Sequence, residues 1–270
     1  MSFHLSHRYV VLAALLAPTM TGCALDPEQE AATAMVQAAL QSAGQQSNAR
    51  QVSAGASEDC STTAEQMAAE AAAAPVVGLY PSSCVTKTAD GAHLQAAYDQ
   101  CNTAFGTSDI SGGIGFSFAS TGACTLRADI ADSGDLTDHG KPYTYEGTAD
   151  ITVQPGERDV SWSDHWKGTT EKDQAIEQTG SWHFVYHVAT GCYDFAGPAN
   201  GTLDGTAYDY EISDLSICQD ECPSKGTVVG HWDDKYEMSI EFDGSAVAKV
   251  TGWTGREFKV EMVCNPAAAH

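Results

Sequence analysis

The feature that most constrains the fold is an alternation of apolar and polar residues through residues 81–265. Segments 94–98, 114–118, 149–153 and 258–262 place an apolar side chain at every second position. Because successive side chains of a β-strand point to opposite faces, this period gives one buried face and one solvent-facing face. The segments are also rich in β-branched and aromatic residues, which favour strands. The sequence therefore predicts an all-β domain.

Short turns are expected between these strands. Three residue pairs that readily adopt positive φ lie between alternating segments: Asp90-Gly91, Asn200-Gly201 and Asp243-Gly244. Tight turns join neighbouring strands in antiparallel order, so we expect an antiparallel meander of about 10–12 strands. Such a meander forms either a two-sheet sandwich or a soluble barrel-like sheet. A membrane barrel fits less well, because it requires strands of roughly 9–11 residues and aromatic girdles.

The cysteines indicate an oxidising compartment. Apart from Cys23, eight cysteines are spread through the chain, and an even number in an exported protein predicts four disulfides. The sequence does not fix the pairing, although Cys84 with Cys101 across one hairpin is the preferred pair. Zinc is the competing interpretation, but no CxxC pair is present. The candidate disulfide residues are Cys60, Cys84, Cys101, Cys124, Cys192, Cys218, Cys222 and Cys264.

Residues 23–80 differ from the β-domain because they are rich in Ala and Gln. Asp26 and Pro27 suit the start of a helix, and a second helix is expected after Thr62, with Glu65 completing its capping box. Residues 45–59 carry almost no large apolar side chains, which is typical of a flexible segment. We therefore expect 23–80 to be a helical and flexible tether, and 266–270 to be a short C-terminal tail.

The first 22 residues have the pattern of an export signal. An apolar run over 9–17 follows Arg8, and it is about half as long as a membrane span. The segment then ends in Met20-Thr21-Gly22-Cys23. This ending resembles the lipobox of bacterial lipoproteins, in which a hydrophobic residue and two small residues precede a Cys. An ordinary secretory signal cleaved nearby is the alternative.

The resemblance to bacterial lipoproteins covers only these first residues, but it has specific implications. It implies that Cys23 becomes the mature N-terminus and carries the lipid, so that the membrane is a partner of the chain. Several acyl chains make such an attachment durable, because one chain alone binds only marginally. Ala24, which follows in place of Asp, resembles sorting to the outer membrane in related lipoproteins. The body resembles only uncharacterised exported β-rich lipoproteins, which supply no functional residues.

The charge of the chain excludes one class of partner. Its net charge is −23, from 36 acidic and 13 basic residues. Such a surface repels phosphate backbones, so we expect no nucleic-acid binding. The acidic residues are spread along the chain instead of forming one acidic tail, which favours a solvated soluble surface.

Two groups of residues are candidates for metal ligands. His183 and His187 have a spacing that suits a shared metal on a helix, but on a strand they lie about 13 Å apart, so we expect them to face solvent separately. Four acidic residues, Asp129, Asp132, Asp135 and Asp138, flank a glycine and are a weak candidate for calcium. Their spacing differs from that of an EF-hand loop, and a hydrated acidic loop is the alternative.

Trp162, Asp164 and Trp166 form the most distinctive side-chain cluster. Two aromatic rings and a carboxylate suit the binding of a sugar, because rings stack on apolar sugar faces and the carboxylate binds hydroxyls. The three residues also share one face of a strand, so the alternative is that they belong to the core.

No enzyme signature is present. The sequence lacks a G-x-S-x-G elbow, an H-E-x-x-H motif, a P-loop and a dinucleotide-binding glycine turn, and it implies no cofactor. We therefore expect a lipid-anchored envelope protein that acts by binding or as a structural module. The sequence does not decide whether its partner is a glycan or a protein. The alternatives are a carbohydrate- or peptidoglycan-active hydrolase with a carboxylate pair, and a calcium-stabilised adhesion module.

Overall fold

The computed structural model describes residues 27–29, 31–36, 38–39, 63–73, 84–101, 109–170, 173–187, 189–218 and 222–262. The signal segment 1–22, Cys23 and the tail 266–270 lie outside these residues. The described part consists of antiparallel strands and a few short helical stretches.

Fifteen strands form the body of the protein. In chain order they are β1 (Val85–Asp90), β2 (His93–Cys101), β3 (Ile110–Gly122), β4 (Thr125–Asp132), β5 (Thr137–Asp138), β6 (Lys141–Pro142), β7 (Thr144–Gln154), β8 (Glu157–Thr169), β9 (Ala175–His187), β10 (Cys192–Leu203), β11 (Thr206–Ile217), β12 (Lys225–Trp232), β13 (Tyr236–Phe242), β14 (Val247–Thr251) and β15 (Glu257–Glu261).

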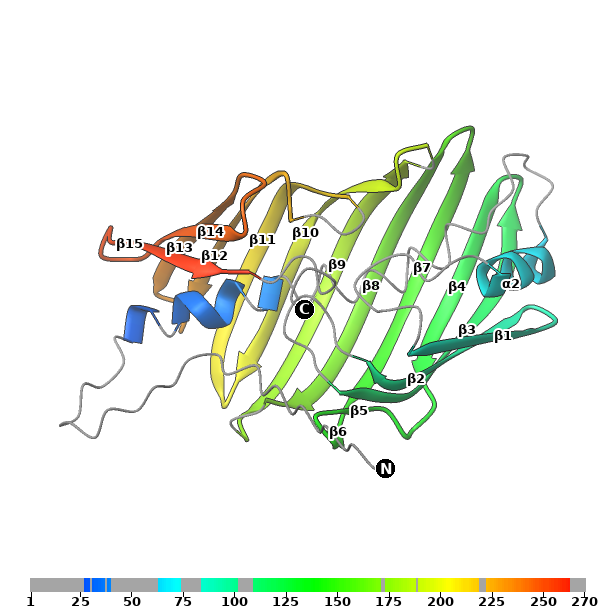
Figure 1. Ribbon diagram of the computed structural model, residues 1–270, viewed down its shortest axis with the longest axis horizontal. Coiled ribbons are helices and arrows are strands. Elements are labelled where there is room, and N and C mark those ends of the chain that lie inside the picture. The colour runs from blue at the N-terminus through cyan, green and yellow to red at the C-terminus, as the bar shows by residue number, and fades with distance from the viewer. Residues whose placement is uncertain are drawn as a thin grey trace, which may run out of the picture.

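All of these strands belong to one sheet, in which nearly every strand pairs with its neighbours in the sequence. The order runs from β1 to β15, with only the short strands β5 and β6 off the path. The expected all-β antiparallel meander is confirmed. It has more strands than the sequence indicated, and its two outermost strands, β1 and β15, do not pair, so the sheet stays open. Figure 1 shows this sheet, with the helical stretches on its near side.

The alternation predicted from the sequence appears as alternating burial along the long strands. In β8 and β9, every second side chain is buried over most of the strand. We call the buried face of the sheet its inner face and the other its outer face. Large aromatic residues dominate the inner face, where Trp162, Trp166, Tyr145, Phe184 and Phe195 are almost completely buried.

An N-terminal helical segment, residues 27–29, 31–36 and 38–39, lies against this core. The side chains of Met35 and Val36 are buried in the core. Tyr210 on β11 donates a hydrogen bond to the carbonyl oxygen of Ala38 at 3.2 Å. The expectation that 23–80 forms a tether therefore needs correction for these residues. Their alanines are small enough for the backbone to approach the sheet closely, so the segment contributes to the core.

The second helix, α2 (Ala64–Ala73), packs on the β1–β3 end of the sheet. Its capping box lies one residue later than expected. The backbone N–H of Gln66 donates to Thr63 Oγ1, and Gln66 Oε1 accepts from the N–H of Thr63. At the other end, Lys87 Nζ donates to the carbonyl oxygen of Ala71 at 2.7 Å, where a cation stabilises the helix dipole. Residues 45–59, expected to be flexible, lie outside the described part of the chain.

The predicted turns are correct at two of the three positions. Gly91 joins β1 to β2 and Gly244 lies between β13 and β14, both with positive φ. Asn200-Gly201 is instead inside β10, and the turn to β11 falls at Asp204-Gly205. The reason is packing between strands, because a side chain at Gly201 would overlap the carbonyl oxygen of Glu177 on β9 and come within 2.7 Å of Tyr208 Oη on β11.

The disulfide prediction is supported in part. Cys84 pairs with Cys101, as preferred from the sequence, and Cys192 pairs with Cys218 across β10 and β11. Cys124 and Cys222 are also disulfide-bonded. Cys60 and Cys264 lie outside the described residues.

A bulge in β10 provides a test of the sheet geometry. The register between β10 and β11 shifts at Gly197, which has φ 144°. A Cβ at this position would overlap the carbonyl oxygen of Ser181 and lie 2.9 Å from Trp182 Cα. We expect G197A to lower the free energy of unfolding by more than about 2 kcal/mol, since strain and overlap add. Denaturant unfolding measures this loss.

The matched control for this prediction is G205A. Gly205 also has positive φ, at 82°, but no atom lies within 4 Å of an added Cβ. Only backbone strain then remains, so G205A should lower the free energy of unfolding by about 1 kcal/mol. Equal losses for the two variants would show that the contact with Ser181 and Trp182 does not matter.

Candidate binding site on the inner face of the sheet

The cluster that the sequence singled out lies on the inner face of β8. Trp162, Asp164 and Trp166 point to the same side, and their exposed fractions are 1%, 4% and 1%. The structure therefore brings the three residues together, in the middle of a strand and inside the core. Asp164 is the only carboxylate among the buried side chains of the described strands.

The Asp164 carboxylate is held by two aromatic donors. The Trp182 indole donates to Oδ1 at 3.2 Å, and the Tyr145 hydroxyl donates to Oδ2 at 3.4 Å. Burial raises the pKa of Asp164 from 3.8 to about 6, while the hydrogen bonds from the indoles and from Tyr145 act in the opposite direction. Burial near this carboxylate also raises the pKa of Tyr145. The inner face thus holds an acid whose protonation changes close to neutral pH.

Glycines on both neighbouring strands make room for this arrangement. Asp164 lies opposite Gly147 on β7 and Gly180 on β9. A Cβ at Gly180 would overlap the indole of Trp182, so glycine is required for that ring to reach Asp164. The sequence contains a signal for this arrangement. Asp164 and Gly180 each stand at a position of their strand where the alternating pattern calls for an apolar residue.

A further indole offers an unused donor. Within the described residues, Trp166 Nε1 is buried and has no hydrogen-bond partner. The Trp166 ring also stacks on Tyr143, with centroids 5.7 Å apart. The surroundings of Asp164 are therefore rich in donors and aromatic faces.

Gln178 on β9 forms a second buried polar centre, which sequence reasoning missed. Its Oε1 accepts from the hydroxyls of Tyr208 and Tyr210 at 3.1 and 3.0 Å. The Tyr210 hydroxyl also lies 3.2 Å from the Ala38 carbonyl oxygen, so it has two acceptors for one hydrogen. Burial raises the pKa of Tyr208. This centre connects the sheet to the N-terminal helical segment.

An apolar pocket lies beside Gln178, between the N-terminal helical segment and the inner face of the sheet. Its open space, including the mouth, is about 250 Å³. The lining residues are Ala34, Met35 and Ala38 from the segment, and Ile176, Leu203, Tyr208 and Trp232 from the sheet. No charged side chain lines it, so its chemistry suits an apolar group.

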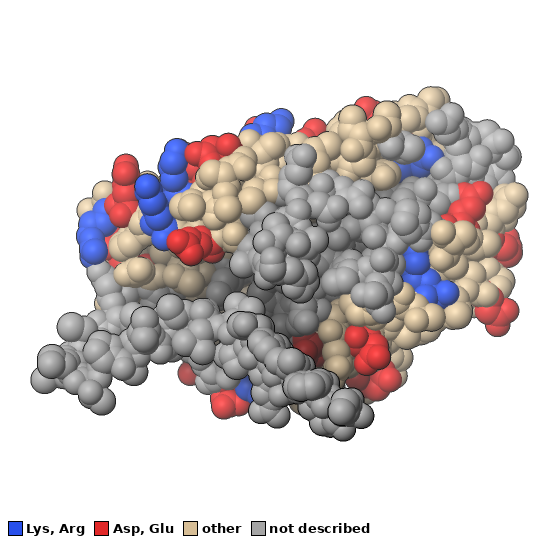
Figure 2. Space-filling view, in the orientation of Figure 1, with Lys and Arg blue, Asp and Glu red and all other residues tan. Residues whose placement is uncertain are grey.

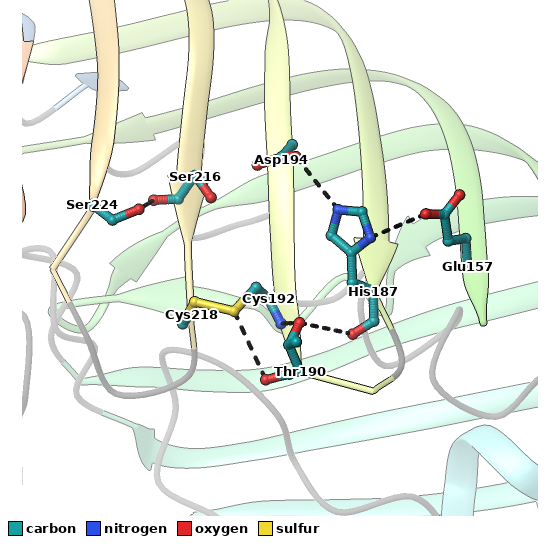
Figure 3. A network of polar contacts seen from close by, with 8 residues as sticks. All are labelled: Glu157, His187, Thr190, Cys192, Asp194, Ser216, Cys218 and Ser224. Atoms are coloured by element: carbon teal, nitrogen blue, oxygen red, sulfur yellow. Dashed lines mark hydrogen bonds and ion pairs between the residues drawn. A yellow bond between two sulfur atoms is a disulfide. The ribbon is translucent and has the colours of Figure 1, made fainter.

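Histidines on the outer face are paired with carboxylates of neighbouring strands. His187 lies between Glu157 and Asp194, at 3.3 and 3.4 Å, close to the Cys192–Cys218 disulfide (Figure 3). His183 Nε2 lies 2.9 Å from Asp159. As expected, the two histidines are on the solvent side and contact different carboxylates.

His165 and His231 follow the same pattern on β8 and β12. Hydrogen bonds with Glu146 and Glu177 raise the pKa of His165, and Asp209 raises that of His231. Because these side chains alternate with the buried ones, the outer face carries most of the interactions between charged groups of the central strands.

The acidic residues considered for calcium are not gathered around one point. Asp129 contacts Arg127 on the same strand. Asp132 accepts hydrogen bonds from the backbone N–H groups of Gly134 and Tyr145. Asp135 accepts hydrogen bonds from the Ser133 hydroxyl and the Gly113 N–H. Asp138 lies 2.6 Å from His139 Nδ1. Across the described residues, no group of three or more His, Cys, Asp or Glu side chains is placed to hold a metal ion.

Comparison with known proteins gives no relative. No protein-family model, curated protein or solved structure matches the chain. In the described part of the chain, no helix is long and apolar enough to cross a membrane. The class defined here is therefore structural: an open antiparallel sheet with an aromatic inner face and a helical segment docked on it.

The raised pKa of Asp164 predicts how stability depends on pH. Between pH 3.8 and about 6, the unfolded chain has released a proton that the folded protein keeps. Raising the pH through this range therefore favours unfolding, by about 3 kcal/mol in total. We expect D164N, which stays neutral, to lack this loss. Denaturant unfolding of both proteins at pH 4 and pH 7 measures the difference.

A carboxylate on the outer face of the same sheet provides the control. Asp129 has a side chain that is 67% exposed, and D129N should follow the wild-type curve between the two pH values. If D164N loses as much stability as the wild type on going from pH 4 to pH 7, another group causes the dependence.

Proposed function

We propose that this chain is an exported lipoprotein, anchored to the bacterial envelope through Cys23, whose β-domain binds an apolar or amphiphilic ligand on its inner face. The anchor rests on the lipobox-like ending of the signal segment. The observation that supports binding is the apolar pocket between the N-terminal helical segment and β9–β12.

The size and lining of the pocket favour a narrow apolar group. Its enclosed cavity is only about 20 Å³, far below the roughly 300–1,000 Å³ of typical small-molecule sites, and the open space of about 250 Å³ includes solvent at the mouth. The pocket therefore suits only the tip of a larger apolar molecule, such as the end of an acyl chain. The hydroxyls of Tyr208 and Tyr210 are bonded to the Gln178 amide, so the pocket takes the apolar part of an amphiphile and leaves its polar part outside.

The inner face gives less support to the carboxylate-pair hydrolase. That mechanism needs two carboxyl groups about 5–9.5 Å apart on either side of the scissile bond. Among the described residues, the only buried carboxylates are Asp164 and Glu28. Asp164 contacts Trp182 and Tyr145, whereas Glu28 contacts Thr254, so the two share no partner. Binding is therefore favoured over hydrolysis.

The anchor is tested by C23A. Without a lipid-bearing Cys, the protein should leave the membrane fraction as a folded, soluble domain with its disulfides intact. Fractionation of cells, followed by non-reducing electrophoresis, measures both properties. If C23A still sediments with membranes, Cys23 is not the anchor.

The pocket is tested in this soluble variant with a fluorescent fatty acid. A34F places a ring in the space lined by Ala34, Met35 and Trp232, so the affinity should fall by at least about tenfold, or about 1.4 kcal/mol. A89F is the matched control, because Ala89 is exposed on β1 and does not line the pocket. Equal binding by A34F and A89F would contradict the proposed site.

A further inference from the structure

The start of the N-terminal helical segment is fixed to one end of the sheet. Glu28 is 3% exposed, and its Oε1 accepts from the backbone N–H of Thr254 at 2.7 Å. The Thr254 hydroxyl lies 3.0 and 2.8 Å from the two Glu28 oxygens. Thr254 is in the turn between β14 and β15. This contact determines where the chain that precedes residue 28 leaves the domain.

Glu28 lies only five positions after Cys23 in the sequence. A fully extended chain of that length spans at most about 18 Å. A lipid on Cys23 therefore holds the β14–β15 turn close to the bilayer. A protein with a free tether over 23–80 could stand away from the membrane, but this one cannot do so while Glu28 is bound to Thr254.

The same end of the sheet carries an aromatic pair, of which one ring is exposed and the other is partly buried. Tyr236, at the start of β13, contacts Trp253 in the β14–β15 turn, with ring centroids 4.6 Å apart. Tyr236 is 39% exposed, and Val229 is the only other large apolar side chain exposed among the described residues. Tyr and Trp are enriched at membrane–water interfaces, because an apolar ring with a polar group suits the headgroup region.

The pocket lies at the same end of the sheet as the β14–β15 turn. In the antiparallel meander, the β10–β11, β12–β13 and β14–β15 turns all lie at one end of the sheet. Leu203, Tyr208 and Trp232, which line the pocket, are near that end. The anchor exit, the aromatic pair and the apolar pocket therefore share one end of the molecule.

We propose that the end of the sheet formed by the β12–β13 and β14–β15 turns contacts the phospholipid bilayer, with Tyr236 and Trp253 in the headgroup region. We call this end the membrane tip. The inference rests on the proposed anchoring through Cys23. It adds an orientation, in which the pocket faces the membrane and its ligand comes from the lipid phase.

Charge does not drive this contact. Residues 225–262 hold five basic and seven acidic residues, and Figure 2 shows both kinds interspersed near the β12–β15 end. At the tip, Lys235 pairs with Asp233 at 2.9 Å and Arg256 lies over the Phe258 ring. The short anchor and the aromatic pair hold the tip on the membrane, so binding should not require anionic lipids.

Hydrogen–deuterium exchange of the lipidated full-length protein in phosphatidylcholine vesicles tests the orientation. Compared with soluble C23A, we expect the amides of 232–237 and 251–257 to exchange several-fold more slowly. The β13–β14 turn, at the opposite end of the same strands, should exchange equally in both proteins. Tip amides that exchange as fast on vesicles as in C23A would overturn the proposal.

Two variants separate the causes of this protection. Inserting about 20 Gly/Ser residues between Cys23 and Pro27 should abolish tip protection while the protein stays in the membrane fraction. Y236S with W253S should weaken it, whereas V229S, which removes an exposed apolar side chain from the outer face, should not. Protection that persists with the long linker, or that V229S reduces equally, would contradict the proposed contact.

The experiment also distinguishes this inference from the anchoring on which it rests. If the wild-type protein is absent from the membrane fraction, the lipoprotein proposal fails. If it is present there but its tip amides are unprotected, the anchoring holds and the membrane tip is wrong.

Discussion

The architecture depends on covering the inner face of an open sheet. A closed barrel buries its inner side chains against one another, but here the outermost strands do not pair, so other parts of the chain must shield the aromatic residues from water. The N-terminal helical segment does this over β9–β12, and α2 does it at the β1–β3 end. Two polar contacts fix the segment in place, from Tyr210 to Ala38 and from Thr254 to Glu28.

This way of covering the sheet connects packing with binding. Small side chains such as Ala34 and Ala38 bring the segment close to the sheet, but they leave the apolar pocket beside Tyr208 and Trp232 unfilled. The buried acid and amide lie in the same layer of aromatic residues, where unpaired polar groups are costly. Asp164 satisfies this constraint through Trp182 and Tyr145, and Gln178 does so through two tyrosine hydroxyls.

Much of the sheet could be predicted from the sequence, because a period of two directly reports a strand with one buried face. The antiparallel order, the Cys84–Cys101 pair and the outward direction of His183 follow from such local patterns. The prediction of a turn at Asn200-Gly201 was wrong. Gly201 is a glycine because Tyr208 on the neighbouring strand approaches it closely. The docking of the N-terminal helical segment and the role of Gln178 were missed for the same reason. Both depend on residues far away in the sequence.

The contact between Glu28 and Thr254 joins residues that are 226 positions apart, whereas almost every strand pairs with its neighbour in the sequence. The meander can therefore form progressively as the chain becomes available, since each pairing closes only a short loop. The helical segment has to wait, although it comes first in the sequence, because its partner belongs to the last hairpin. Its docking is thus a late step that depends on the rest of the domain being complete. Before that step, the inner face near β11–β15 lacks its cover, and a chain truncated before Thr254 cannot form the contact that holds the segment in place.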